Sequence, residues 1–184
     1  MARAEIALKR ARAAYTRAHL VAGLRGVVVA GALIAVAVTL HRITHATWFA
    51  AGILAITLGV LGWRGGPMRR GSLAGVLAGL PPMFAPVFVS LVSHGGLRCA
   101  ECPTMPSLAC TLTCFGTAAL VGVVVGNHAT RDASPSRFAF AATLTAALTG
   151  ALGCGTTGIG GALGIAVGLV AGGVTGWVAT ARAA

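Results

Sequence analysis

The sequence predicts an all-α fold: an integral membrane bundle of about six transmembrane helices with both termini in the cytoplasm. Of the 184 residues, 57% are hydrophobic and 9% are charged, whereas soluble domains carry about 25% charged residues. So few charges cannot cover a water-facing surface, and hydrocarbon is therefore the expected surrounding. Two further observations support this prediction, namely the long apolar segments and the uneven placement of basic residues between them.

Apolar segments of membrane-spanning length recur along the chain. A helix needs about 20 apolar residues to cross about 30 Å of hydrocarbon. The candidate segments cover residues 21–40, 46–63, 72–94, 107–126, 137–153 and 157–180, of which the fifth is the shortest. The chain thus divides into a basic cytoplasmic N-terminal helix (1–20), a six-span domain (21–180) and a short cytoplasmic tail (181–184).

The basic residues predict the orientation. If the N-terminus is cytoplasmic and the spans alternate, twelve of the 14 Lys and Arg residues lie inside, and only Arg42 and Arg98 lie outside. Such a bias in short loops follows the positive-inside rule, and it indicates a multi-pass protein of a bacterial inner membrane. The net charge of +11 is spread between apolar segments rather than along one face. We therefore expect no direct binding of nucleic acid.

The N-terminal segment 3–20 reads as a basic helix. Lys9, Arg10, Arg12 and Arg17 alternate there with apolar residues. Such a helix can lie on an anionic membrane surface or bind a cytoplasmic partner. The simpler interpretation is a topology anchor that continues into the first span.

The third apolar segment carries three prolines near its middle, Pro81, Pro82 and Pro86. Each proline removes a backbone donor and clashes with the preceding turn, which predicts a kinked or broken helix. Breaks of this kind occur at transport sites in membrane proteins, and they also occur as plain bends. Both interpretations remain open from the sequence.

The last apolar segment carries a stripe of glycines at every fourth position. The stripe consists of Gly160, Gly164, Gly168, Gly172 and Gly176. Stripes of small residues let two helix backbones approach closely. The stripe predicts either packing inside the bundle or an interface with a second copy or another membrane subunit.

Catalytic signatures are missing from the sequence, and we do not expect an enzyme. There are no paired carboxylates, no H-E-x-x-H and no phosphate-binding glycine loop. No Asp, Glu or Lys lies within the six apolar segments. Ion-coupled carriers usually keep such groups in the membrane as relays, so coupled transport is disfavoured.

The five cysteines are the one group of residues whose side chains suit redox chemistry or metal binding. Cys99 and Cys102 lie between the third and fourth apolar segments, Cys110 and Cys114 begin the fourth, and Cys154 follows the fifth. By the orientation above, all five lie on or near the outer side of the membrane. That side is oxidising in bacteria, so structural disulfides are the first interpretation.

The possible disulfide pairs are limited by geometry. Cys110 and Cys114 share one helical face, which aligns them poorly for a bridge to each other. Bridges from the loop that holds Cys99 and Cys102 to Cys110 or Cys114, or from Cys114 to Cys154, are more plausible. An odd number of cysteines leaves at least one thiol free or intermolecular.

Two other interpretations of the cysteines compete with the disulfides. Thiolates suit zinc or copper(I), with Cys99, Cys102, Cys110 and Cys114 as candidate ligands and His94 as a nearby imidazole. Alternatively, the thiols change state in response to oxidants or metals and so shift the packing of the helices. The sequence leaves all three open.

Two stretches support a family resemblance. LACTLTCFGTAALVGVVVG (108–126) and ASPSRFAFAATLTAALTGALGC (133–154), followed by a glycine-rich last span, resemble the six-helix membrane anti-sigma factors of proteobacteria. Members of that family hold extracytoplasmic-function sigma factors at the inner membrane. The resemblance implies that Cys110 or Cys114, together with Cys154, are signal-responsive thiols. It also implies that the N-terminal helix around residues 5–17 binds the sigma factor.

The leading hypothesis from the sequence is therefore a membrane regulator. Its outer thiols sense redox state or metal, and its cytoplasmic helix contacts a protein partner. Two alternatives belong to other classes. One is a transporter of a soft metal or small solute that enters at the cysteines, and the other is a structural subunit packed through the glycine stripe.

Overall fold

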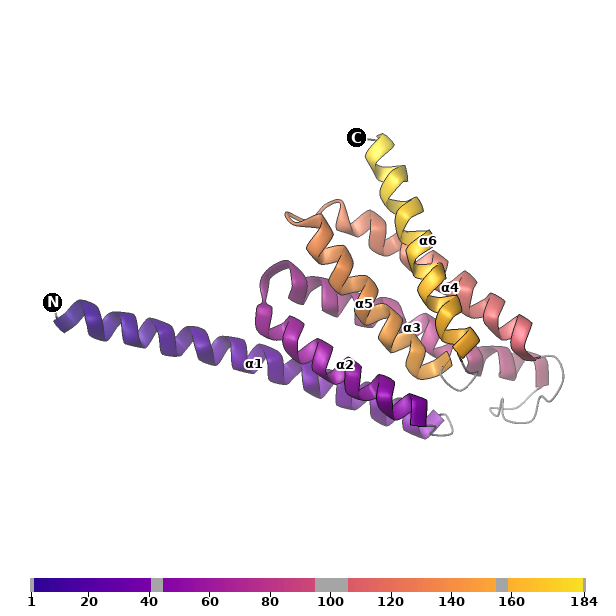
Figure 1. Ribbon diagram of the computed structural model, residues 1–184, viewed down its shortest axis with the longest axis horizontal. Helices are drawn as coiled ribbons and strands as arrows, with labels where there is room; N and C mark the ends of the chain where they lie inside the picture. The colour runs from indigo at the N-terminus through magenta and orange to yellow at the C-terminus, as the bar shows by residue number, and fades with distance from the viewer. Residues whose placement is uncertain (1, 41–44, 95–105, 155–158, 184) are drawn as a thin grey trace.

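The computed structural model describes residues 2–40, 45–94, 106–154 and 159–183 (Figure 1). These residues form six α-helices, and each predicted apolar segment coincides with one of them. The helices are α1 (Ala2–Leu40), α2 (His45–Arg64), α3 (Gly66–His94), α4 (Pro106–Ala129), α5 (Pro135–Cys154) and α6 (Ile159–Ala183). Within the described residues, α1, α2, α4 and α6 contain segments long and apolar enough to cross a membrane. The all-α prediction is confirmed.

The helices associate as three close pairs, and glycines set the distance in each pair. In α1 and α2, which run antiparallel, a Cβ on Gly26 would lie 2.7 Å from the Leu58 carbonyl oxygen, and a Cβ on Gly62 would lie 2.9 Å from the Ala22 carbonyl oxygen. Side chains larger than hydrogen cannot fit at these positions. The two backbones therefore touch, as in other membrane helix pairs built on small residues.

Helices α3 and α5 form the second pair and run parallel. A Cβ on Gly71 would lie 2.5 Å from the Phe138 carbonyl oxygen, and a Cβ on Gly79 would lie 2.6 Å from Cβ of Thr149. Between these two contacts, Thr145 Oγ1 lies 3.1 Å from the Ser72 carbonyl oxygen and donates a hydrogen bond to it. A buried polar contact thus reinforces the close approach of the backbones.

Helices α4 and α6 form the third pair, also parallel, and this pair uses the glycine stripe. A Cβ on Gly168 would lie 2.6 Å from the Phe115 carbonyl oxygen, and Gly172 and Gly176 meet the carbonyls of Ala119 and Val123 in the same way. The stripe therefore packs inside the bundle from residue 164 to residue 176. Gly160 carries no described side-chain environment.

Helix α5 is the central helix of the bundle. It packs against each of the other five helices, and it buries Ala141, Ala142, Thr145, Ala146 and Thr149. Its neighbours shield it from the surroundings, so its surface does not need the large apolar side chains that lipid demands. This shielding explains why α5 is rich in alanine and threonine.

The outer surface of the bundle is strongly apolar. Leu24, Ile56, Leu120 and Val170 are each more than half exposed, on α1, α2, α4 and α6 respectively. An apolar surface of this extent is unfavourable in water and favourable in hydrocarbon. Leu77 of α3 and Phe140 of α5 are exposed to a similar degree, so all six helices present apolar side chains at the surface.

The prolines of α3 do not break that helix. It continues from Gly66 to His94 through all three of them, and both Pro82 and the neighbouring Met83 are buried. Tolerance of proline within a membrane helix is expected where neighbouring helices cover the affected turn. Of the two outcomes predicted from the sequence, a broken helix is wrong.

Both chain ends lie at the same end of the bundle as the α2–α3 and α4–α5 turns (Figure 1). Helix α1 has 39 residues and is about 58 Å long at 1.5 Å per residue. Its N-terminal half extends past α2 and away from the other helices, as Figure 1 shows. At this end the α2–α3 connection turns through Gly65 and Gly66, whose φ angles of 67° and 57° favour glycine.

Candidate functional site

The cysteine that the structure describes in full, Cys114, lies in the core. Its side chain is 1% exposed and belongs to a cluster with Ala118, Ala146, Ile165 and Leu169. These residues come from α4, α5 and α6, so Cys114 lies where three helices meet. Its sulfur is disulfide-bonded, and the bonding partner lies outside the described side chains.

The remaining cysteines are described incompletely or not at all. Cys110 lies in α4 and Cys154 is the last residue of α5, but their side chains lie outside the described set. Cys99 and Cys102 belong to residues 95–105, which are also outside it. Apart from the disulfide of Cys114, the described residues do not show how the five predicted thiols are arranged.

The predicted metal site falls mostly on the same undescribed positions. His94 ends α3 without a described side chain, as does Cys110 within α4. Among the described residues, no three His, Cys, Asp or Glu side chains gather. Because Cys114 is the one proposed ligand with a described side chain, binding of zinc or copper stays a prediction.

The predicted partner-binding residues lie on the projecting part of α1. Lys9, Arg10, Arg12 and Arg17 are all exposed to solvent, on the segment of α1 that extends past the bundle. None of them forms a salt bridge with any residue that the structure describes. Their positive charges are therefore available to an external surface.

A hydrogen bond and an aromatic contact connect α1 to α2 at the point where the projecting segment meets the bundle. His19 Nδ1 hydrogen-bonds the carbonyl oxygen of Trp63, which is one of the free carbonyls at the C-terminal end of α2. The His19 ring centroid lies 6.4 Å from that of Trp63 in α2 and 4.2 Å from that of Tyr15 in α1. Gly65 lies against the imidazole, since a Cβ there would be 3.3 Å from Cε1 of His19.

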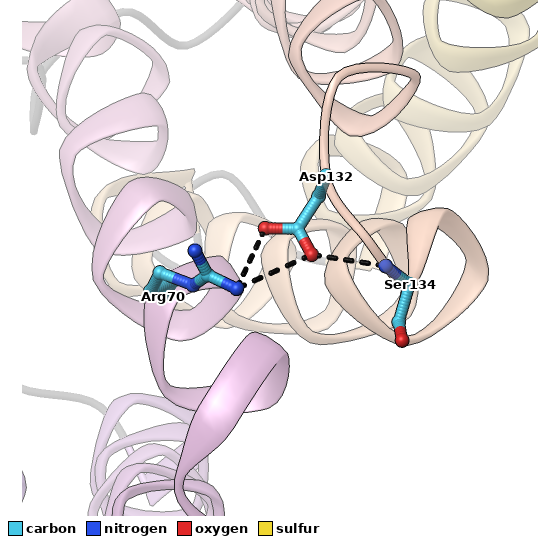
Figure 2. A network of polar contacts seen from close by, with 3 residues as sticks. All are labelled: Arg70, Asp132 and Ser134. Carbon is cyan, nitrogen blue, oxygen red and sulfur yellow. Dashed lines mark hydrogen bonds and ion pairs between the residues drawn. The ribbon is translucent and has the colours of Figure 1, made fainter.

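A second polar contact connects α3 to the turn between α4 and α5. Arg70 Nη2 lies 3.3 Å from Oδ2 and 3.5 Å from Oδ1 of Asp132, and Oδ1 also accepts a hydrogen bond from the Ser134 backbone N–H (Figure 2). Ser134 precedes α5, and Pro135 begins it, at the first helical position where proline is favoured. Asp132 therefore both holds the turn and pairs with α3.

Sequence reasoning identified neither of these two contacts as a site. His19 and Asp132 are single polar residues in polar segments, and no periodicity links them to Trp63 or Arg70. The weak signal available for Asp132 was its position two residues before Ser134 and three before Pro135, a pattern typical of a helix start. The long-range partner of each residue becomes visible only in the folded chain.

Fold and site together define a class: an all-α bundle with four helices able to cross a membrane, a core cysteine and a projecting basic helix. No protein-family model, curated protein or solved structure matches this chain. The particular function is therefore argued from the chemistry of these residues.

Proposed function

We propose that the protein is a multi-pass regulator of the bacterial inner membrane, of the anti-sigma-factor type. In this proposal, thiols on the outer side respond to redox state or metal, and the projecting part of α1 binds a cytoplasmic protein. The observation that carries the proposal is the place of Cys114. A disulfide-bonded sulfur at the junction of α4, α5 and α6 couples a chemical change to helix packing.

The proposed membrane topology has six spans with the basic end inside. Helix α3 has 29 residues and α5 has 20, which correspond to about 43 Å and 30 Å of helix, enough to cross the hydrocarbon layer. The modest hydrophobicity of α5 fits its sheltered position in the bundle, whereas α3 exposes Leu77 and Phe88. The arginines of the α2–α3 turn, the α4–α5 turn and the C-terminus lie at one end, as the positive-inside rule requires.

We propose Cys154 as the disulfide partner of Cys114. Helices α4 and α5 are antiparallel, because Val125 and Ala129 cluster with Phe138 and Ala142 at one end, while Cys114 clusters with Ala146 further along. Because the two helices are antiparallel, residues nearer the start of α4 lie beside residues nearer the end of α5. Cys154 occupies that end.

The proposed switch is a two-electron reaction. A dithiol reductant donates two electrons and two protons, the S–S bond of Cys114 breaks, two thiols form, and the reductant becomes a disulfide. Each new thiol needs more room than the bonded sulfur, because S–S separation is about 2.0 Å and non-bonded atoms need about 3.5 Å. A tightly packed core must shift to provide that room.

The route from the core to the projecting helix runs through α5 and α1. Helix α5 packs against α4 and α6, which surround Cys114, and also against α1 and α2. Helix α1 is continuous from the bundle into the basic segment. A change in the packing of α5 therefore reaches the segment that carries Arg12 and Arg17 without crossing a flexible joint.

The proposed binding surface on α1 is cationic, so it fits an acidic face of a protein partner. Lys9, Arg10, Arg12 and Arg17 present four positive charges within about two and a half turns of helix. Complementary charge accelerates association and discriminates between partners. An acidic protein surface therefore forms the expected contact, and the sigma factor of the implied family is the leading candidate.

The test is co-purification of the partner under two redox conditions. Tagged protein is extracted in mild detergent from cells with and without a membrane-permeable dithiol, and captured proteins are identified by mass spectrometry. We expect a cytoplasmic protein whose captured amount differs at least about three-fold between the two conditions. Cys114→Ala and Cys154→Ala should each abolish that difference and leave the capture at the level of the reduced protein.

The control is a charge-reversed binding helix, Arg12→Glu with Arg17→Glu, which should lose the partner in both conditions while Cys114 still oxidises. Oxidation is read out by the mass of alkylated cysteine peptides with and without prior reduction. Capture that is equal under both conditions, and equal in both cysteine variants, would contradict the regulatory proposal.

A further inference from the structure

An open apolar groove lies between α4, α5 and α6, near the end of the bundle that holds the C-terminus. Its volume is about 330 Å³, and it is lined by Val125 and Gly126 of α4, Ala139 and Thr143 of α5, and six residues of α6 from Leu169 to Val178. Only the Thr143 hydroxyl and the Trp177 indole N–H are polar among the lining side chains. The volume lies at the lower end of the range typical of ligand sites.

The groove exists because glycines replace side chains where α4 and α6 meet. Gly126 faces the carbonyl oxygen of Gly173 so closely that no Cβ fits between them. Gly173 itself has room for a Cβ, since the nearest atom, the Gly122 carbonyl oxygen, would be 3.9 Å away at an ordinary contact distance. Close packing on one side of the helix pair therefore leaves a hollow on the other side.

Trp177 lines the groove at its end nearest the C-terminus. Its side chain is 37% exposed, and its indole N–H has no acceptor among the residues that the structure describes. Tryptophans with one apolar and one hydrogen-bonding edge concentrate at the boundary between hydrocarbon and headgroups. Trp177 therefore marks the level at which a lipid carries its ester groups.

Three arginines lie within five positions in the sequence of residues that line the groove. Arg182 lies in the last turn of α6, Arg131 lies in the turn after α4, and Arg137 lies in the first turn of α5, and all three are exposed. The one acidic side chain described at this end, Asp132, already pairs with Arg70. The headgroup level next to the groove is therefore electropositive.

We propose that the groove binds one anionic phospholipid. An acyl chain lies along α6 between Leu169 and Val178, the ester region meets the Trp177 indole, and the phosphate lies near Arg182 and Arg131. Charge complementarity selects this occupant. A second copy of the chain in the same groove would bring equal positive charges together, whereas basic sites between membrane helices suit anionic headgroups.

The test uses tryptophan fluorescence with brominated lipids, which quench an indole that touches their acyl chains. A protein with Trp48→Phe and Trp63→Phe leaves Trp177 as the one indole, and Trp63→Phe keeps the backbone carbonyl that His19 contacts. The protein is placed in phosphatidylcholine vesicles that contain 10% brominated phosphatidylglycerol or, for comparison, 10% brominated phosphatidylcholine. We expect at least about three-fold stronger quenching by the anionic lipid.

Two matched substitutions separate groove filling from general disturbance. Gly173→Leu places its side chain in the groove, with its Cβ 3.9 Å from the Gly122 carbonyl oxygen, and it should remove the preference for the anionic lipid. Gly52→Leu makes the same change on the exposed face of α2, where no atom lies within 4 Å of a Cβ, and it should leave the preference intact. Arg182→Gln should lower the affinity for the anionic lipid about five-fold, which brings quenching by the two lipids close to equal, since one cation near the surface contributes roughly this factor.

Equal quenching by the two lipids, or an anionic preference that survives Gly173→Leu, would overturn the proposal. Absence of quenching by either lipid would also overturn it, because Trp177 would then be covered by protein. Circular dichroism of each variant confirms that the helices are retained. The readout does not involve the cysteines or the cytoplasmic partner, so its failure is distinguishable from failure of the regulatory proposal.

Discussion

Arg70 and Asp132, which are 62 residues apart, join the start of α3 to the turn that begins α5. The carboxylate is 8% exposed, whereas the guanidinium side chain is 64% exposed. Because Arg70 is largely in solvent, the ion pair itself contributes little, on the order of 0–1 kcal/mol. The hydrogen bond from the Ser134 N–H to Asp132 is local and does not depend on Arg70.

These two roles of Asp132 predict a graded loss of stability. Asp132→Ala removes both the ion pair and the hydrogen bond at the helix start, and we expect a loss of about 1–2 kcal/mol. Asp132→Asn keeps an acceptor for Ser134 and should lose less than about 1 kcal/mol, as should Arg70→Gln. Thermal unfolding of the detergent-solubilised variants measures the order, and equal losses for all three would disprove the separation of roles.

The α4–α6 pair predicts opposite outcomes for two nearby glycines. Gly168→Ala places a methyl group 2.6 Å from the Phe115 carbonyl oxygen, so the helices must separate, at a cost of about 1–3 kcal/mol. Gly173→Ala meets nothing closer than 3.9 Å and should be neutral, or stabilising by up to about 1 kcal/mol through helix propensity. Unfolding by a denaturing detergent compares the two. A Gly173→Ala variant as unstable as Gly168→Ala would contradict the described packing.

The contact between His19 and Trp63 predicts that the projecting helix loosens when the imidazole is removed. His19→Phe keeps the aromatic contact with Tyr15 but removes the donor to the Trp63 carbonyl, a loss of about 1 kcal/mol. Hydrogen exchange of the last turn of α2 and the α1 segment 15–22 should accelerate about five-fold. Exchange should remain unchanged in the α4–α6 pair, which serves as the internal control, and uniform acceleration throughout would indicate general destabilisation instead.

The six-span topology predicts the side on which each fusion point lies. A reporter that is active only in the cytoplasm, fused after residue 65, after residue 132 or after residue 184, should be active at all three points. After residue 43 and after residue 156 that reporter should be inactive, and a reporter that is active only in the periplasm should be active instead. If α3 does not cross the membrane, the fusion after residue 132 changes sides. If α5 does not cross, the fusion after residue 132 keeps its side and the fusion after residue 156 changes sides.

The helices themselves were predictable because their signal is local. Each apolar segment satisfies its backbone hydrogen bonds within itself, so composition and length locate it without knowledge of its neighbours. For the same reason the bounds of α2, from His45 to Arg64, agree with the predicted 46–63 within one residue. The continuous helix through Pro81 and Pro82 was harder to predict, because its tolerance of proline depends on the helices that cover it.

The candidate site was only partly predictable. The sequence singled out Cys114 by its residue type, but its place between Ala146 and Ile165 depends on which helices meet there. Polar contacts such as that between His19 and Trp63 join residues 44 positions apart, and no repeating pattern in the sequence indicates them. The glycine stripe of α6 predicted a close helix contact without naming the partner.

By itself, the sequence determined that this chain forms helices of membrane length, how charge is distributed between them, and that one face of the last helix is made of glycine. Those properties follow from the composition of single segments. Only the tertiary structure decided that α6 packs in parallel with α4, that α5 lies at the centre, and that Cys114 is enclosed by three helices. Apolar helices in lipid gain little from hydrophobicity when they associate, so the choice of partner depends on the fit of glycine against a particular backbone, and that fit exists only once both helices are in place.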